Sequence, residues 1–272
     1  MVEILMSTYN GSKYIKEQIE SILSQTYDDW HLLIRDDGSS DTTVDIIKEY
    51  QEKYPDKIKF LNQRKNLGAL HSFEELLNIA NATYYMFCDQ DDVWLPNKIK
   101  NAITSIKEIE KPGLPAVVYS DLCVVDEKLQ KINSSFFESA RIVPRFLQKK
   151  EELAVNNYAA GCTMLFNDDA KKVSLPFGKY ATMHDSWVLL SVLTKVGIIK
   201  QIPSIDILYR QHGRNVCGAY QVDYNFKYLV TKIKNFKSVI RSYKSMYLQA
   251  NELFGMSICS FCFQRIKYLC KR

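Results

Sequence analysis

The chain has 272 residues, of which 46% are hydrophobic and 25% are charged, and its formal net charge is +5. This length fits one large domain or two small ones, and the composition is that of a globular protein, which excludes collagen-like and low-complexity chains. Ten of the 36 basic residues but only two of the 31 acidic residues lie in 221–272, so a basic segment follows a mildly acidic body.

Strands and helices alternate along the first part of the chain. Short apolar runs that end in polar residues predict four strands, at 4–6, 30–34, 58–61 and 84–88. Apolar residues at helical spacing after each of the first three strands predict helices through 15–23, 44–50 and 73–80. Four alternations within about ninety residues are typical of βαβ units and predict a mostly parallel sheet with helices on both faces.

The middle of the chain is less regular. Further strands are predicted at 117–119, 161–166, 198–202 and 207–209, with a helix over 185–193 and an irregular stretch over 121–158. Because no linker separates the two halves, we expect one continuous α/β domain over 1–220. Within it, residues 1–115 are expected to bind a nucleotide and residues 116–220 to receive a second substrate.

The segment 221–272 mixes apolar and basic residues. From Asp223 onward the apolar residues recur every three or four positions, which predicts an amphipathic helix, and residues 261–272 repeat the mixture. A basic amphipathic helix can lie on an anionic membrane surface, which predicts peripheral membrane contact through 223–272. The alternative is a helix that packs on its own domain with a solvated basic face, and both interpretations stay open here.

The charge distribution also bears on partners and location. A basic appendage on a mildly acidic domain is not the pattern of a nucleic-acid-binding protein, so none is expected as a partner. No run approaches the ~20 apolar residues that span a bilayer, and the first residues do not resemble a signal peptide. Seven cysteines, an odd number, suit reduced thiols better than a disulfide framework. We therefore expect a cytoplasmic location, on the inner face of the plasma membrane if the C-terminal segment binds lipid.

Polar side chains follow each of the first four predicted strands. They are Ser7, Thr8, Asn10, Asp36, Asp37, Asn66, Asp89, Asp91 and Asp92. In open α/β sheets, ligands bind outside the carboxyl ends of the strands. The sequence therefore predicts a binding site at this edge of the sheet.

Asp89 and Asp91 form a D-x-D pair directly after the fourth strand. In an extended segment, residues i and i+2 point the same way, so both carboxylates are expected to face one volume. Two such carboxylates repel each other unless a cation lies between them, and Mg²⁺ binds through one or two carboxylates plus substrate phosphates. Carboxylates that only cap a helix or a turn are the alternative, and the fourth βαβ strand before them favours the metal site.

Motifs of other common enzyme classes are absent from the sequence. There is no P-loop, no dinucleotide fingerprint, no G-x-S-x-G elbow and no H-E-x-x-H. The motifs that are present resemble those of glycosyltransferase family 2, the inverting enzymes with the GT-A fold. In chain order they are STYNGSKYI, ILSQTYDDW, RDDGSSDTT, KNLGA and FCDQDDVWLPNKI, with HDSW and YRQHG further on. The last three resemble most closely the bacterial rhamnosyltransferase-like branch, which builds cell-surface polysaccharides.

The resemblance implies a fold and a donor site. The fold is a single Rossmann-like GT-A domain with a mostly parallel sheet, and the ligand is a nucleotide sugar held with Mg²⁺ or Mn²⁺. Its binding residues are implied to be Ser7, Thr8, Tyr9 and Asp37 near the base, Asn66 and Gly68 near the ribose and diphosphate, and Asp89 and Asp91 at the metal. His212 matches a position over the diphosphate, and Arg210 or Arg214 is suited to neutralise the leaving nucleotide.

The resemblance also implies a catalytic base. An inverting transfer needs a carboxylate that removes the proton of the attacking hydroxyl. Family members keep it at the start of a helix, usually as Glu-Asp, and here His184 replaces the Glu while Asp185 keeps the key position. His184 is expected either to orient Asp185, to touch the acceptor, or only to pack. A helix-capping role for Asp185 is compatible with its role as the base.

These inferences together predict a metal-dependent inverting glycosyltransferase. It is expected to move one sugar from a nucleotide sugar to a hydroxyl of a growing, lipid-linked surface polysaccharide, with dTDP-rhamnose as the favoured donor. A UDP-hexose donor is the first alternative, and a catalytically inactive scaffold of a polysaccharide assembly complex is the second. A sugar nucleotidyltransferase is disfavoured because the loop after the first strand has one glycine and not a glycine-rich basic sequence.

Overall fold

The computed structural model describes residues 1–63, 65–140, 142–144, 148–156, 159–213 and 236–271. The strands of its large sheet are β1 (Val2–Thr8), β2 (Trp30–Asp36), β3 (Ile58–Leu61), β4 (Tyr84–Cys88), β6 (Ala116–Ser120), β9 (Met164–Asn167) and β10 (Ile198–Ile202). A small sheet contains β5 (Val93–Trp94), β7 (Cys123–Val125), β8 (Lys131–Asn133) and β11 (Ile207–Arg210). The helices are α1 (Ile15–Leu23), α2 (Thr43–Lys53), α3 (Gly68–Ile79), α4 (Lys98–Lys107), α5 (Phe136–Ser139), α6 (Lys150–Ala154), the 3₁₀ turn η2 (Gly161–Thr163), α7 (Asp168–Ser174), α8 (His184–Thr194), α10 (Phe236–Phe254) and α11 (Ile258–Lys271).

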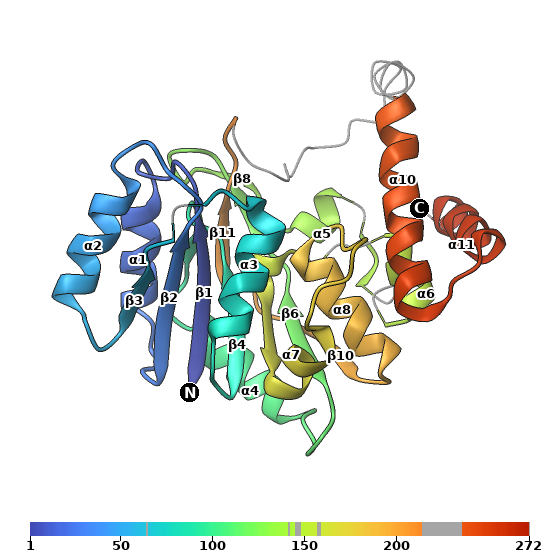
Figure 1. The fold of residues 1–272 in the computed structure, drawn as a ribbon, viewed down its shortest axis with the longest axis horizontal. Helices are drawn as coiled ribbons and strands as arrows, with labels where there is room; N and C mark the ends of the chain where they lie inside the picture. The colour runs from blue at the N-terminus through green and yellow to red at the C-terminus, as the bar shows by residue number, and fades with distance from the viewer. Residues whose placement is uncertain (64, 141, 145–147, 157–158, 214–235, 272) are drawn as a thin grey trace.

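The large sheet has the order β10-β6-β9-β4-β1-β2-β3 (Figure 1). Strands β4, β1, β2 and β3 run parallel, β6 and β10 run parallel, and β9 is antiparallel to both β4 and β6. The predicted mostly parallel α/β sheet is therefore confirmed. Thr8 pairs with Asp36 and Met6 pairs with Cys88, so the strands end at one edge and bring the polar residues after them together.

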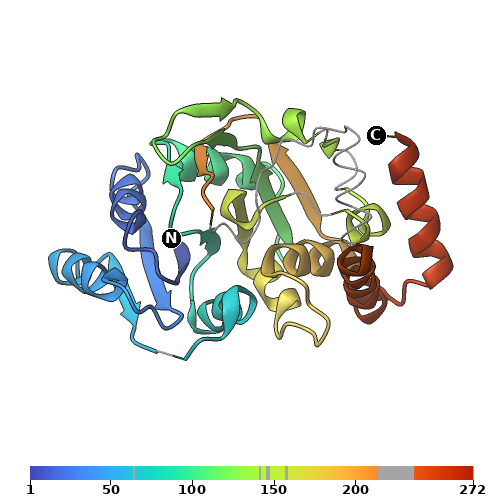
Figure 2. The same cartoon turned by 90° about the horizontal axis from the view of Figure 1, so that it is seen from above.

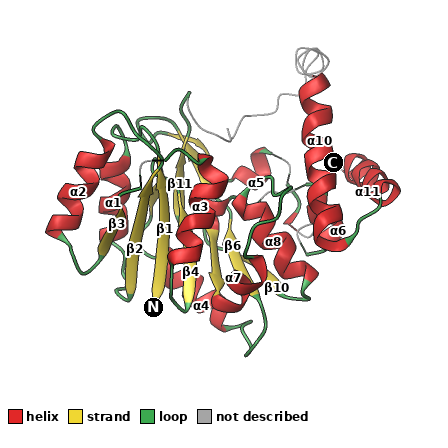
Figure 3. Ribbon diagram, in the orientation of Figure 1, coloured by secondary structure: helices red, strands yellow, loops and turns green. Residues whose placement is uncertain are grey.

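Helices cover both faces of the large sheet, as the ribbon in Figure 3 and the view from above in Figure 2 show. Alternate residues of a strand point to opposite faces. In β1, Leu5 joins an apolar cluster that includes side chains of α3, α7 and α8, whereas Ile4 and Met6 join a second cluster with side chains of α1, α2 and α4. The sheet is thus buried on both sides, which explains why its strands read as continuous apolar runs rather than alternating ones.

The second half departs from the predicted elements in two places. Residues 161–166, predicted as a strand, begin with the 3₁₀ turn Gly161–Thr163, and only Met164–Asn167 is extended. The stretch 121–158, predicted as irregular, supplies β7 and β8 of the small sheet and the short helices α5 and α6. In the small sheet β11 lies between β5 and β7, and this pairing carries the end of β11 to the acidic turn after β4.

The C-terminal helices α10 and α11 lie beside α6 and α8 at one end of the molecule (Figure 1). Buried side chains of these helices and of the connection between them belong to the same apolar cluster as Trp187 of α8, and they are Ala250, Met256, Phe261 and Tyr268. Outward, α11 exposes Ile258, Phe263, Ile266 and Leu269. The start of the basic amphipathic stretch, from Asp223 to residue 235, lies outside the described residues, and Arg214 does too. Among the helices that the structure describes, none is both long enough and apolar enough to cross a bilayer.

Candidate active site at the carboxyl edge of the sheet

The loop after β1 is fixed by the loop after β2. Asp36 accepts hydrogen bonds from Thr8 Oγ1 at 2.9 Å and from the Ser39 backbone N–H at 2.8 Å. Ser7 pairs with Arg35 along the strands. Tyr9 is half exposed, and its backbone is bound by the Gln90 side chain. The Tyr9 N–H donates to Gln90 Oε1 at 2.9 Å, and Gln90 Nε2 donates to the Tyr9 carbonyl at 3.0 Å. Two residues predicted to contact the nucleotide base, Thr8 and Tyr9, are therefore held on the acidic edge of the sheet.

Asp37 connects the loop after β2 to the loop before α3. Its carboxylate accepts hydrogen bonds from Arg35 Nη1 at 2.7 Å, from Ser72 Oγ at 2.9 Å, and from the backbone N–H groups of Leu67 and Gly68 at 2.6 and 2.8 Å. Although burial acts to raise it, these bonds hold the pKa of Asp37 below its usual value. Asp37 is 4% exposed. As placed, it fixes the conformation of the segment that contains Asn66 and Gly68.

Gly68 starts α3 with a φ of +73°, a conformation that L side chains rarely adopt. Asn66, two residues before it, is exposed at the surface of the same loop. Arg35 Nη2 donates to the carbonyl of Lys65 at 2.6 Å, which holds this loop from its other end. The loop predicted to lie near the ribose and diphosphate is therefore anchored to the sheet edge through buried Arg35.

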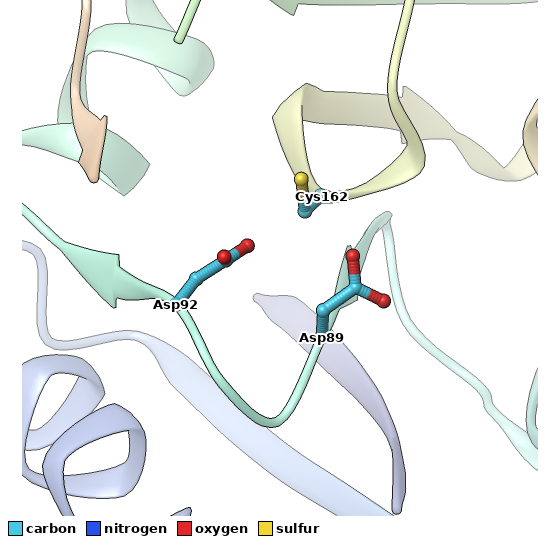
Figure 4. Close-up of side chains that lie close together, drawn as sticks. All are labelled: Asp89, Asp92 and Cys162. Carbon is cyan, nitrogen blue, oxygen red and sulfur yellow. The ribbon is translucent and has the colours of Figure 1, made fainter. Parts of the chain in front are cut away.

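The acidic turn after β4 differs from the predicted extended geometry. Residues 90–91 form a turn, so the prediction that Asp89 and Asp91 point the same way as neighbours on a strand is wrong. Instead Asp89 and Asp92, three residues apart, face the same space from the two ends of the turn, and Cys162 of η2 faces them (Figure 4). One ligand atom from each of these three residues lies within 4.8 Å of the others.

The electrostatics of this turn favour a bound cation. Burial first, and then the negative charges of Asp91 and Asp185, raise the pKa of Asp89 to about 7. Burial and the charges of Asp91 and Asp89 also raise the pKa of Asp92 well above its usual value. Buried carboxylates shift in this direction because their charge is neither solvated nor paired, and a divalent cation would reverse the effect.

The neighbours of Asp92 and Asp89 differ in charge. Lys98, buried beneath the turn, is near Asp92, and the backbone N–H of Arg210 donates to Asp92 Oδ1 at 3.2 Å. The groups that act on Asp89 are two carboxylates and the Cys162 thiol, whose own pKa burial raises. A protonated thiol is a poor ligand for a hard cation, so carboxylate oxygens are the donors that fit Mg²⁺ or Mn²⁺ here.

Asp91 and His212 form a pair at the mouth of the site. Asp91 Oδ2 lies 2.7 Å from His212 Nε2, and the imidazole stacks on Tyr14 with ring centroids 5.0 Å apart. The side chains of Asp91 and His212 are only 15% and 9% exposed. His212, predicted over the diphosphate, is thus placed directly on the carboxylate that was predicted to bind the metal.

Arg210 is buried below this pair rather than exposed to a ligand. Its Nε donates to the carbonyl of Asp91 at 2.9 Å and its Nη1 to the carbonyl of Glu127 at 2.7 Å, and its Nη2 pairs with Glu17. The guanidinium also lies over the Tyr14 ring, and the side chain is 2% exposed. In this position Arg210 stabilises the main chain of the acidic turn.

Asp185 reaches the same site from the other half of the domain. It lies in the first turn of α8, where its Oδ1 accepts from the Ser186 N–H at 2.5 Å and its Oδ2 from the Gly161 N–H at 3.2 Å. Its charge acts on Asp89, so the two carboxylates share one region although they are distant in sequence. A helix N-terminus favours negative charge, so the start of α8 is a suitable place for the Asp185 carboxylate.

His184 packs in the core beside Asp185. Its ring centroid lies 4.0 Å from that of Phe73 and 4.6 Å from that of Phe87, and a Cβ on Gly161 would lie 2.4 Å from its Nε2. Burial lowers the pKa of His184 to about 3. The packing alternative for His184 therefore agrees with its surroundings, and the ring stays uncharged at neutral pH.

We expect His184 to make the protein less stable in mild acid. Unfolded His184 binds a proton below about pH 6.5 and the folded ring does not, so the free energy of unfolding falls as pH drops from 6.5, by up to about 1.4 kcal/mol per unit. Urea unfolding of His184→Leu between pH 5 and 7.5 should give a flatter profile than the wild type. The same change at exposed His31 should leave the slope intact, and a His184→Leu profile parallel to the wild type would contradict the assignment.

Some residues of the site had no counterpart in the sequence-based prediction. Arg35 had a usable signal, because a charged residue at the end of the apolar strand WHLLI must find a buried partner. The sequence carried no such signal for Cys162 and Gln90, because their roles depend on which loops meet at the edge of the sheet.

Comparison with known proteins identifies the family. Residues 3–173 match the model of the glycosyl transferase family 2. The dTDP-rhamnosyl transferase RfbG of Shigella flexneri is 31% identical over 239 residues, which cover 82% of this chain and 76% of RfbG. The chain belongs to glycosyltransferase family 2. Another relative of this glycosyltransferase is WfaP of Escherichia coli, a UDP-Glc:alpha-D-GlcNAc-diphosphoundecaprenol beta-1,3-glucosyltransferase, 29% identical over 88% of this chain and 86% of WfaP.

Solved structures confirm the GT-A fold of this glycosyltransferase. TarS 1–349 of S. aureus in complex with UDP-GlcNAc superposes with a TM-score of 0.64 at 15% identity, over 98% of this chain and 71% of TarS 1–349. The mannosyltransferase PcManGT of Pyrobaculum calidifontis, in complex with GDP-Man and Mn²⁺, gives a TM-score of 0.61 at 14% identity, over 99% and 79% of the two chains. At these identities the likeness concerns the fold, and the family assignment rests on the sequence matches.

Proposed function

We propose that this glycosyltransferase moves a single sugar from a nucleotide sugar to a hydroxyl of a surface polysaccharide, with inversion and with a divalent metal. The observation that carries the proposal is the convergence of Asp89, Asp91 and Asp185 at the carboxyl edge of the sheet, where burial and then the charges of Asp91 and Asp185 raise the pKa of Asp89. We favour rhamnose from dTDP-rhamnose as the transferred sugar. The resemblance to RfbG supports that choice, and relatives with UDP-Glc in their names make a UDP-hexose the alternative.

The nucleotide is proposed to bind along the ends of β1 and β2. Ser7, Thr8, Tyr9 and Asp37 would contact the base, and half-exposed Tyr9 offers a ring for stacking. The loop with Asn66 and Gly68 would lie against the ribose and diphosphate. The burial of Arg210 favours an indirect role for it, which is to hold the main chain of Asp91 where that residue meets the diphosphate.

The metal is proposed to be Mg²⁺ or Mn²⁺, held by Asp89 and Asp91 together with the donor phosphates. Oxygen donors and uncompensated negative charge fit such an ion. When bound, it supplies positive charge that stabilises the departing nucleoside diphosphate. His212 fixes the Asp91 carboxylate through its 2.7 Å contact.

Asp185 is proposed to be the general base. Its carboxylate would take the proton of the acceptor hydroxyl as that oxygen attacks the anomeric carbon from the face opposite the leaving nucleotide. The C–O bond to the nucleotide breaks as the new glycosidic bond forms, which inverts the anomeric centre. The N–H groups of Gly161 and Ser186 hold the carboxylate at the start of α8.

We propose that the acceptor is lipid-linked and that residues 223–272 approach an anionic membrane surface on the cytoplasmic side. The exposed apolar side chains of α11 and the basic composition of the segment support this, as does the diphosphoundecaprenol acceptor in the name of WfaP. Replacing exposed Phe263 and Ile266 with Ser should lower sedimentation with phosphatidylglycerol vesicles by about tenfold or more, since each buries several methylene groups on binding. Equal sedimentation of this variant and the wild type would contradict membrane contact through α11.

The class of reaction is tested by nucleoside-diphosphate release from a panel of dTDP-, UDP- and GDP-sugars, without an added acceptor. Slow hydrolysis of one donor is expected with Mg²⁺ or Mn²⁺, and EDTA should abolish it. Release of dTDP from dTDP-rhamnose would support dTDP-rhamnose as the donor. Release of UDP from a UDP-hexose would make that UDP-hexose the donor instead. If calorimetry detects no donor binding in the presence of metal, the inactive-scaffold alternative replaces the proposed activity.

A further inference from the structure

Helix α10 of the C-terminal segment makes hydrogen bonds to the residues that lead into α8. The Gln249 carbonyl oxygen, Oε1, accepts from Thr182 N at 2.6 Å and from Thr182 Oγ1 at 2.8 Å. The Gln249 amide, Nε2, donates to Ser186 Oγ at 2.8 Å. Thr182 and Ser186 lie on either side of Asp185, so one side chain of α10 holds both flanks of the proposed base.

A second residue of α10 fixes the beginning of the same segment. The Glu252 carboxylate accepts from the backbone N–H groups of Lys179 and Tyr180 at 3.0 and 2.9 Å. Gly178 is packed tightly here, since a Cβ on it would lie 2.2 Å from the Trp187 ring and 2.5 Å from Glu252 Oε2. The segment 178–186 is therefore held against α10 at both ends.

The contact of Gln249 with Ser186 is polar although both side chains are buried. Gln249 is 2% exposed and Ser186 is 7% exposed, and their neighbours Ala250 and Trp187 belong to one apolar cluster. An apolar residue at 249 would pack there without the cost of burying an amide, whereas a satisfied buried network specifies one geometry. A single fixed geometry would be needed here if the segment 178–186 has to hold a reacting group, the Asp185 carboxylate, in place.

We propose that Gln249 is a positioning residue for catalysis, which sets the orientation of the Asp185 carboxylate through Thr182 and Ser186. The C-terminal helix α10 is then part of the active-site framework and not an appendage. This inference rests on the role of Asp185 in the proposed function. A misplacement of about 1 Å of a reacting group can cost about 10²-fold in rate, so loss of these bonds should affect turnover more than donor binding.

The test compares Gln249→Leu with Tyr247→Leu in the full chain. Tyr247 packs on Phe261 in the same interface, with ring centroids 5.8 Å apart, so its variant loosens the packing of α10 on α11. With dTDP-rhamnose and UDP-glucose as probes, Gln249→Leu should lower kcat for metal-dependent hydrolysis by about tenfold or more and leave the donor KM within about twofold. Gln249→Glu keeps an acceptor for Thr182, so its kcat should lie between that of Gln249→Leu and that of the wild type.

Hydrogen–deuterium exchange of residues 178–187 gives a readout that does not depend on activity. Gln249→Leu should accelerate exchange there by about tenfold relative to Tyr247→Leu at matched thermal stability. Unchanged exchange overturns the inference, and so does accelerated exchange with a kcat equal to that of Tyr247→Leu. If the wild type binds no donor in the presence of metal, the proposed function fails by itself, and exchange still decides whether Gln249 positions the segment.

Discussion

Asp185→Asn is expected to lower kcat for sugar transfer by about 10²–10⁴-fold, the usual contribution of a general base, while the affinity for the donor stays within about twofold. The amide has the shape of the carboxylate and can still accept from the Gly161 N–H, but it cannot take the proton of the attacking hydroxyl. The measurement is kcat for hydrolysis or transfer, together with donor affinity by calorimetry with Mn²⁺.

A matched control separates catalysis from helix stabilisation. Asp169 lies in the first turn of α7 much as Asp185 lies in the first turn of α8, but it is away from the acidic turn. Loss of either charge weakens its helix by about 0.3–1 kcal/mol, so both variants should unfold slightly earlier. Only Asp185→Asn should lose activity. Full activity of Asp185→Asn would remove it from the role of base.

Asp91→Ala is expected to abolish the metal dependence of donor binding. The variant loses a carboxylate beside Asp89 and, with it, the contact to His212. Removal of groups that only orient metal ligands costs about 10–100-fold in metal affinity, so loss of a direct ligand should cost at least as much. Calorimetry should give the same weak donor affinity for Asp91→Ala with Mn²⁺ as for the wild type with EDTA.

The control for Asp91→Ala is Asp45→Ala, which removes an exposed carboxylate from α2 and should bind donor and metal as the wild type does. Wild-type affinity for donor and Mn²⁺ in Asp91→Ala would sink the assignment of Asp91 as a ligand. In that case Asp89 and Asp92, which face each other across the turn, would be the residues to test next.

Local sequence was sufficient for most of the first half of the domain. The strands at 58–61 and 84–88 have the predicted limits, and the parallel arrangement follows from the alternation of strands and helices. Because parallel strands end at one edge, the side chains after β1, β2 and β4 had to meet there. The short elements between 121 and 158 were missed because they pair with distant residues and have no periodicity of their own.

The sequence predicted the carboxylates of the acidic turn, but it did not predict their geometry. The letters D-x-D predicted a carboxylate cluster, whereas the turn at 90–91 turns Asp91 toward His212 and brings Asp92 opposite Asp89. That turn is decided by the pairing of β5 with β11 and by the buried contacts of Arg210, which join residues far apart in the chain. Spacing along a sequence cannot give such contacts.

The composition of the C-terminal segment, basic and amphipathic, is a property of the sequence, and it left two interpretations open. Which face is buried depends on α6 and α8, which present an apolar surface to Ala250 and Phe261. It also depends on the segment before α8, whose backbone N–H groups donate to Gln249 and Glu252. The sequence thus sufficed for the family, through the resemblance of its motifs. It also sufficed for the sheet and the acidic residues at its edge, because periodicity and strand direction are local. The partners of those residues required the folded chain, since hydrogen bonds between loops form only when distant segments meet.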